Sequence, residues 1–189
     1  RNKKKIIYIV LHYTGMKKEA QAIKRLCDSK SKVSSHYFIK NNGKVLNLIP
    51  DLYTAWHAGD SKWKKFKSLN NYSIGIEISN PGHDHGYKKF SSKQILSIIA
   101  LLRFLIRKYK IKKQNILGHS DIAPNRKKDP GEKFPWSRLA KKNLCKWHNL
   151  REEKIRKNRN LKLNISDEKL FFSNLYKIGY SISKKKMKK

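Results

Sequence analysis

The sequence predicts an α/β domain in which helices flank a mixed central β-sheet, followed by a short helical extension. Short apolar segments of strand type alternate with segments whose apolar residues recur at helical spacing. A marked change to charged residues follows Trp147. Because 189 residues suffice for one domain of ordinary size and a small appendage, we expect a domain over residues 1–145 and an extension over 146–189.

Four segments account for the predicted strands. Residues 6–12 (IIYIVLH) are β-branched and almost entirely apolar, which is typical of a central strand covered on both faces. Residues 36–49 contain two short strands around an Asn-Gly turn, a strong hairpin signal. Residues 73–79 (SIGIEIS) alternate strictly, so Glu77 is expected on the face opposite three isoleucines. Residues 115–119 (NILGH) form a last short strand.

Two helices are predicted against this sheet. Residues 17–29 carry apolar side chains at helical spacing. Residues 91–109 do so over a longer stretch, and Ser91 and Gln94 have the spacing of a capping box at its start. Strands and helices that alternate in this way predict a mixed sheet with helices packed against it.

The extension carries a weaker signal. Residues 149–164 are charged and poor in large apolar side chains, so a linker or an exposed helix is expected. Residues 166–180 regain helical periodicity, with Ser166 as the N-cap and Gly179 as the stop, and residues 183–189 form a basic tail expected to be disordered. About forty residues are too few for an independent core, so the extension either packs on the domain or is the remnant of a larger module.

Composition limits the partners. The chain has 46 Lys and Arg against 13 Asp and Glu, a formal charge of +33, which would attract the phosphates of a nucleic acid. The lysines are spread along the whole chain without a nucleic-acid-binding signature, so nucleic acid is not expected as the main partner. A polyanionic cell-envelope surface suits this charge equally well. No segment approaches the ~18 apolar residues of a membrane span.

Two further features concern processing and redox state. The chain begins at Arg1 rather than Met, so we expect the natural start, with any targeting signal, to lie upstream. Cys27 and Cys145 are expected to be unpaired thiols, with Cys27 buried on the apolar face of its helix.

The loop GHSDIAPNRKKDPG (118–131) combines metal-competent and cationic residues, and its prolines and glycines exclude a regular element through most of its length. His12 ends one predicted strand, His119 follows another, and Asp129 stands in the loop. Two strand-end histidines and one carboxylate leave a fourth position for water, which is typical of catalytic zinc. Asp121 competes with Asp129, but its position two residues after His119 better suits loop capping or indirect support.

The other histidines carry weaker signals. His83 and His85 could form an alternative metal pair, but an unstructured insertion after a strand is the favoured interpretation. His36 is expected to pack or hydrogen-bond beneath the site. His148 has no neighbouring group that suggests a function.

Five segments together resemble one known family: VLHYT (10–14), SSHYFI (34–39), AWHAG (55–59), SIGIEIS (73–79) and GHSDIAPNRKKDPGEKFPW (118–136). They are similar to the zinc-dependent N-acetylmuramoyl-L-alanine amidases of the amidase-2 family, in particular its AmiD-like branch, over roughly residues 5–142. The resemblance implies the mixed sheet and flanking helices of the amidase-2 and peptidoglycan-recognition-protein fold.

The resemblance also implies a role for each matching residue. The ligands of a single zinc ion fall on His12, His119 and Asp129. The general acid–base falls on Glu77, and the cation that stabilises the developing oxyanion falls on Lys127. These assignments agree with the ligand set that the chemistry of the residues favours.

The AWHAG segment implies a substrate groove that includes Trp56 and His57. Phage-type relatives place a tyrosine where this chain has Ser35, which favours the glutamate-dependent mechanism. The implied reaction is hydrolysis of the amide bond between the lactyl group of N-acetylmuramic acid and the L-alanine of the stem peptide, in cell-wall turnover or recycling. The implied partners are peptidoglycan or muropeptide fragments.

A non-catalytic peptidoglycan-recognition module is the alternative. Every metal and catalytic position that the resemblance identifies is filled, so an active enzyme is favoured. We expect a monomer. A location in the cell envelope, in the periplasm or at the outer membrane, is favoured over the cytoplasm.

Overall fold

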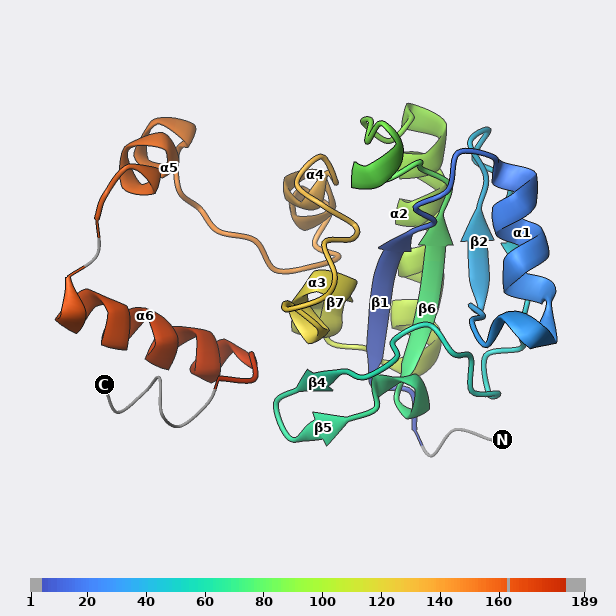
Figure 1. Ribbon diagram of the computed structural model, residues 1–189, viewed down its shortest axis with the longest axis horizontal. Coiled ribbons are helices and arrows are strands. Elements are labelled where there is room, and N and C mark those ends of the chain that lie inside the picture. Colours follow the sequence, from blue (N-terminus) through green and yellow to red (C-terminus); the bar gives the residue numbers. More distant parts are fainter. Residues whose placement is uncertain (1–4, 163, 183–189) are drawn as a thin grey trace.

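The computed structural model describes residues 5–162 and 164–182, and its centre is a mixed five-stranded sheet (Figure 1). The strand order is β3-β2-β6-β1-β7. Strands β2 (Tyr37–Ile39), β6 (Ser73–Ile78), β1 (Tyr8–Tyr13) and β7 (Ile116–Gly118) are parallel, whereas β3 (Val45–Asn47) pairs antiparallel with β2. The predicted strands and the hairpin around the Asn-Gly turn are therefore confirmed.

The long helix α2 (Ser92–Tyr109) covers one face of this sheet (Figure 1). Ser91 Oγ accepts from the Gln94 backbone N–H and the Gln94 side chain accepts from the Ser91 N–H, which confirms the capping box. The buried apolar side chains of α2 join those of β1 and β6 in the main core, which includes Ile9, Leu11, Ile74, Ile76, Ile78, Ile98 and Leu102. The main core thus uses the isoleucine face of β6.

The face of the sheet away from α2 carries polar residues predicted for the functional site. Tyr8 and Val10 of β1 pack there against a smaller cluster with Leu117 and Ile122. The next residue of β1 on that face is His12, and it lies beside Glu77 in the parallel register of β1 and β6. Period-two alternation therefore puts a histidine and a carboxylate together on the face away from α2.

Shorter elements surround this face. Helix α1 (Glu19–Cys27) lies beside the sheet, and one turn, α3 (His119–Ile122), follows β7 within the loop predicted to be irregular. Helix α4 (Trp136–Lys141) and the 3-10 turns η1 (Ser29–Ser31), η2 (Leu69–Asn71), η3 (His83–His85) and η4 (Lys113–Asn115) complete the domain. A two-stranded sheet of β4 (Lys62–Trp63) and β5 (Phe66–Lys67), which was not predicted, lies at one end (Figure 1).

The extension contains α5 (Glu152–Arg159) and α6 (Ile165–Ile178), which confirms the two predicted segments. The predicted N-cap of α6 was wrong: Asn164 is the cap, because its Oδ1 accepts from the Asp167 N–H at 2.8 Å. Ser166 lies inside the first turn and donates to the same Oδ1. Gly179 ends the helix as predicted. The basic tail over 183–189 lies outside the described residues.

Both cysteines are free, but Cys27 is exposed rather than buried. It is the last residue of α1, where Ala22 is the only buried side chain, so the apolar stripe of α1 is covered only in its middle. Cys145 is buried in the main core. Within the described ranges, no helix has the length and apolar character needed to cross a membrane.

Candidate functional site

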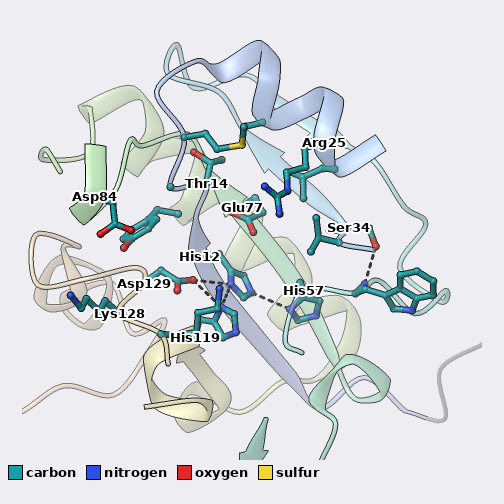
Figure 2. A pocket seen from close by; sticks show the side chains of 18 of the residues that line it. His12, Thr14, Arg25, Ser34, His57, Glu77, Asp84, His119, Lys128 and Asp129 are labelled. Carbon is teal, nitrogen blue, oxygen red and sulfur yellow. Dashed lines mark hydrogen bonds and ion pairs between the residues drawn. The ribbon is translucent and has the colours of Figure 1, made fainter. Parts of the chain in front are cut away.

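Three predicted ligands converge at the carboxyl ends of β1 and β7 (Figure 2). His12 Nδ1 and His119 Nδ1 are 2.9 Å apart, and Asp129 Oδ2 lies 3.0 Å from the first and 3.1 Å from the second. All three side chains are buried. Tetrahedral zinc with bonds of about 2.0–2.1 Å holds its ligand atoms roughly 3.3 Å apart, so the triangle has nearly the size that zinc needs.

The contacts of Nε2 in His12 and His119, on the side of each ring away from the triangle, indicate which nitrogen carries the proton. His119 Nε2 lies 3.1 Å from the Ala58 carbonyl oxygen, which can only accept. His119 Nε2 is therefore the donor, and its Nδ1 presents a lone pair to the triangle. Backbone carbonyls commonly hold metal-binding histidines in this way.

A longer hydrogen-bond chain orients His12. Its Nε2 lies 3.0 Å from His57 Nδ1, and His57 Nε2 lies 3.1 Å from Ser73 Oγ. The Ser73 hydroxyl donates to the Leu69 carbonyl at 2.6 Å, so its oxygen can accept from His57. This direction makes His12 Nε2 a donor to His57 and leaves His12 Nδ1 unprotonated. The pattern places three acceptors around one point, a donor set that suits a cation.

The hydrogen-bonded chain from His12 through His57 to Ser73 has room because residue 75 is glycine. A Cβ built on Gly75 would lie 2.3 Å from the His57 ring, so a larger residue in the middle of β6 would displace His57. The sequence offered the signal for Ser73, because Ser73, Gly75 and Glu77 share one face in the predicted alternation. Sequence reasoning nevertheless missed Ser73.

Burial and neighbouring charges favour the metal-binding protonation states. Burial, together with His119, lowers the pKa of His12 to about 4. Burial alone would raise the pKa of Asp129, but hydrogen bonds and charge interactions with His119 and His12 outweigh it and hold this pKa below its usual range. A neutral His12 imidazole and an ionised Asp129 carboxylate are the forms in which these two residues would bind zinc.

Glu77 extends into the cleft beside His12 (Figure 2). Its Oε2 is enclosed and has no hydrogen-bond partner among the described residues. Burial, followed by the charge of Asp129, raises its pKa well above the usual value, and the charge of Lys127 opposes this rise. A carboxyl group with a raised pKa beside a candidate metal site is suited to proton transfer.

The cleft around these residues has a volume of about 420 Å³. The residues predicted to contact substrate or assist the reaction, Trp56, His57 and Lys127, all line it. Trp56 is 54% exposed, so its ring is available to a ligand, whereas His57 is buried. The structure therefore brings together every residue predicted for the site.

The remaining histidines divide as follows. His36 is buried beneath the site, where its Nδ1 accepts from the Gly75 N–H, as predicted. The expectation of an unstructured insertion around His83 was wrong. The segment forms η3, and the His83 imidazole ties it to the rest of the domain by bridging Tyr13 Oη (2.8 Å) and Glu132 Oε2 (2.9 Å).

Comparison with known proteins identifies the family. The Amidase_2 model, described as N-acetylmuramoyl-L-alanine amidase, matches residues 2–132. AmiD of Escherichia coli K12, described as an N-acetylmuramoyl-L-alanine amidase, is 38% identical over 155 residues, which cover 76% of this chain and 55% of the relative. AmpD of Enterobacter cloacae, described as a 1,6-anhydro-N-acetylmuramyl-L-alanine amidase, is 39% identical over 111 residues, 57% of this chain and 55% of the relative. The chain spans about half the length of these curated relatives.

Two solved structures share the fold. E. coli AmiD in complex with the substrate anhydro-N-acetylmuramic acid-L-Ala-D-γ-Glu-L-Lys superposes with a TM-score of 0.80 at 31% identity, over 96% of this chain and 74% of that one. AMPDH3 of Pseudomonas aeruginosa in complex with anhydromuramic pentapeptide gives a TM-score of 0.81 at 29% identity, over 96% and 77%. Since the family model matches residues 2–132, more than half of the chain and a range that includes His12, His119 and Asp129, the chain belongs to the Amidase_2 family.

Proposed function

We propose that this chain is a zinc-dependent amidase that hydrolyses the bond between the lactyl group of N-acetylmuramic acid and the L-alanine of the stem peptide. The observation that carries this proposal is the convergence of three acceptor atoms, two imidazole and one carboxylate, beside Glu77. In this proposal His12, His119 and Asp129 hold one zinc ion. Bound zinc supplies Lewis-acid chemistry, which makes water nucleophilic at neutral pH and polarises the scissile carbonyl.

Glu77 is the proposed general acid–base. Its carboxylate accepts a proton from the attacking water and returns it to the nitrogen of the departing L-alanine, so the C–N bond breaks as an amine leaves. The raised pKa of Glu77 lies closer to neutral pH than that of an ordinary glutamate, so the group can both accept and donate a proton there. Lys127 lines the same cleft, and its ammonium group would stabilise the oxyanion that develops on the lactyl carbonyl.

Peptidoglycan or its muropeptide fragments are the proposed substrates. The AmiD and AMPDH3 structures hold anhydromuramyl peptides, and this chain shares their fold and family. The exposed Trp56 ring at the cleft offers an apolar surface to such a ligand. His57 contacts His12 through Nδ1 and Ser73 through Nε2. We therefore propose that His57 orients His12 as well as lining the cleft.

We propose that the protein is a monomer. We also propose that it acts in the cell envelope, where its positive charge suits polyanionic surfaces. The cytoplasm is the alternative location. Fractionation of the source cells followed by immunodetection would distinguish the two compartments.

Incubation of the zinc-loaded protein with purified muropeptides tests the reaction. Mass spectrometry should detect free stem peptides that begin with L-alanine, together with peptide-free sugars. A chelator should abolish this cleavage and added zinc should restore it, whereas Asp129→Ala should prevent zinc retention. Cleavage within the peptide or between sugars would contradict the proposal. Tight binding without cleavage would instead support a recognition module.

A further inference from the structure

The end of the extension returns to the catalytic domain. The Lys64 N–H, in the turn between β4 and β5, donates to the Gly179 carbonyl at 2.8 Å. The Tyr180 ring packs edge-on against Trp63, with ring centroids 4.9 Å apart. Gly179 permits this approach, because its φ is 141° and a Cβ there would lie 2.7 Å from the Trp63 ring. In Figure 1 the last turn of α6 accordingly lies next to the β4–β5 hairpin.

Tyr180 also reaches the turn that follows β7. Its hydroxyl donates to Asp121 Oδ1 at 2.5 Å, while Asp121 Oδ2 accepts from the Gly118 N–H at 2.7 Å. Burial, and then the charge of Asp121, raise the pKa of Tyr180, so its hydroxyl stays protonated and can donate. Asp121 therefore links the extension to the backbone at the start of α3.

Helix α3 supports a large part of the candidate site. His119 is its first residue, and the Ser120 N–H donates to the backbone carbonyl of Asp129 at 2.9 Å. The Lys127 N–H donates to the Ala123 carbonyl at 3.0 Å, just after the turn. Two candidate zinc ligands and the candidate oxyanion-binding lysine thus depend on the same turn.

We propose that Tyr180 is a positioning residue for the amidase site, acting through Asp121 on α3 and hence on His119 and Asp129. The extension is then part of the catalytic unit rather than a separable module. The predicted effect on catalysis rests on the proposed function, whereas the effect on zinc affinity requires only the His–His–Asp site.

The test is Tyr180→Phe in the full chain, because it removes the hydroxyl and keeps the ring against Trp63. Loss of a group that supports metal ligands indirectly lowers metal affinity about 10–100-fold, and we expect the lower end, about tenfold, because Tyr180 acts through Asp121. Zinc affinity is measured by competition with a chromogenic chelator. With muropeptides, kcat should fall while KM stays nearly constant. Tyr176→Phe is the matched control, since Tyr176 lies on α6 and is 58% exposed.

A second variant tests the route. Asp121→Ala alone should lower zinc affinity at least as much as Tyr180→Phe, because it removes the acceptors for both the Tyr180 hydroxyl and the Gly118 N–H. Adding Tyr180→Phe to it should therefore cause no further loss. Equal zinc affinities for Tyr180→Phe and Tyr176→Phe would overturn the proposal, as would a lower melting temperature with unchanged zinc affinity. Additive losses in the double variant would also overturn it. An inactive wild-type protein would contradict the amidase function and leave the zinc measurement as the test of Tyr180.

Discussion

Helices α2 and α6 have similar sequence signals but different surroundings. Both have a polar N-cap that accepts a backbone N–H, and both carry apolar side chains at helical spacing. Seven residues of α2 are buried, whereas no residue of α6, which the structure describes in full, is buried. Leu170 and Phe171 of α6 are 58% and 49% exposed. Periodicity and caps therefore indicate where a helix begins and ends, but a tertiary partner decides whether its apolar face is covered.

The same contrast separates the two parts of the chain. The domain places His12 and Glu77 on neighbouring strands of the central sheet, where strand register fixes their neighbours, and it places His119 directly after β7. The extension touches this domain through Gly179 and Tyr180, beyond the last turn of α6. Matched substitutions in the two parts test this difference.

The largest expected difference is in the hydrolysis rates of two variants, one at Glu77 in the domain and one at Glu168 in the extension. Glu77→Gln keeps the shape of the side chain and removes proton transfer, so the hydrolysis rate should fall about 10²–10⁴-fold. Zinc content and melting temperature should stay nearly unchanged, because Glu77 lies on the cleft face and outside the main core. Glu168→Gln on the exposed surface of α6 is the control and should leave the rate unchanged.

Steady-state kinetics on muropeptides would measure both variants. A Glu77→Gln enzyme that kept more than roughly a third of its activity would exclude Glu77 as the base, since loss of a general base costs far more. Loss of zinc from the variant would instead put Glu77 among the ligands.

A smaller difference is expected in stability. Leu102 of α2 is fully buried, so Leu102→Ala should lower the free energy of unfolding by about 2–5 kcal/mol. Leu170→Ala on α6 should change it by less than about 0.5 kcal/mol, because its side chain is mostly exposed. Urea unfolding followed by circular dichroism measures both. A similar cost at Leu170 would mean that a partner covers α6 in solution.

Local pattern was enough to predict most of the domain. The apolar runs predicted the strands, alternation predicted the face of Glu77, and two strand ends with one loop carboxylate predicted the metal site. The structure confirms the strand positions and brings the three predicted ligands together.

The missed features depend on contacts between distant segments. Tyr180 and Asp121 are 59 residues apart, and His83 and Glu132 are 49 apart. No periodic pattern reports such a pair, because each contact arises only after the elements have packed. The exposure of Cys27 has the same origin: helical spacing predicts a shared face but not the length over which the sheet covers it.

The smallest expected effects concern the two N-caps. Ser91→Ala removes the acceptor for the Gln94 N–H, and an N-cap lost to alanine costs about 1 kcal/mol. Because α2 is part of the main core, this cost should appear in the global free energy of unfolding. Asn164→Ala removes the corresponding bond to the Asp167 N–H, but α6 has no buried residue through which the loss could reach the core.

Asn164→Ala should therefore leave the urea midpoint of the domain unchanged and speed amide exchange in the first turn of α6 about fivefold, the factor that 1 kcal/mol represents. Hydrogen exchange followed by mass spectrometry measures this rate. Asn164→Gly is the internal control, since glycine at an N-cap costs only a few tenths of a kcal/mol. A shift of the global midpoint by Asn164→Ala, equal to that of Ser91→Ala, would show that α6 unfolds together with the domain. The contrast between the two helices would then hold for burial but not for cooperativity.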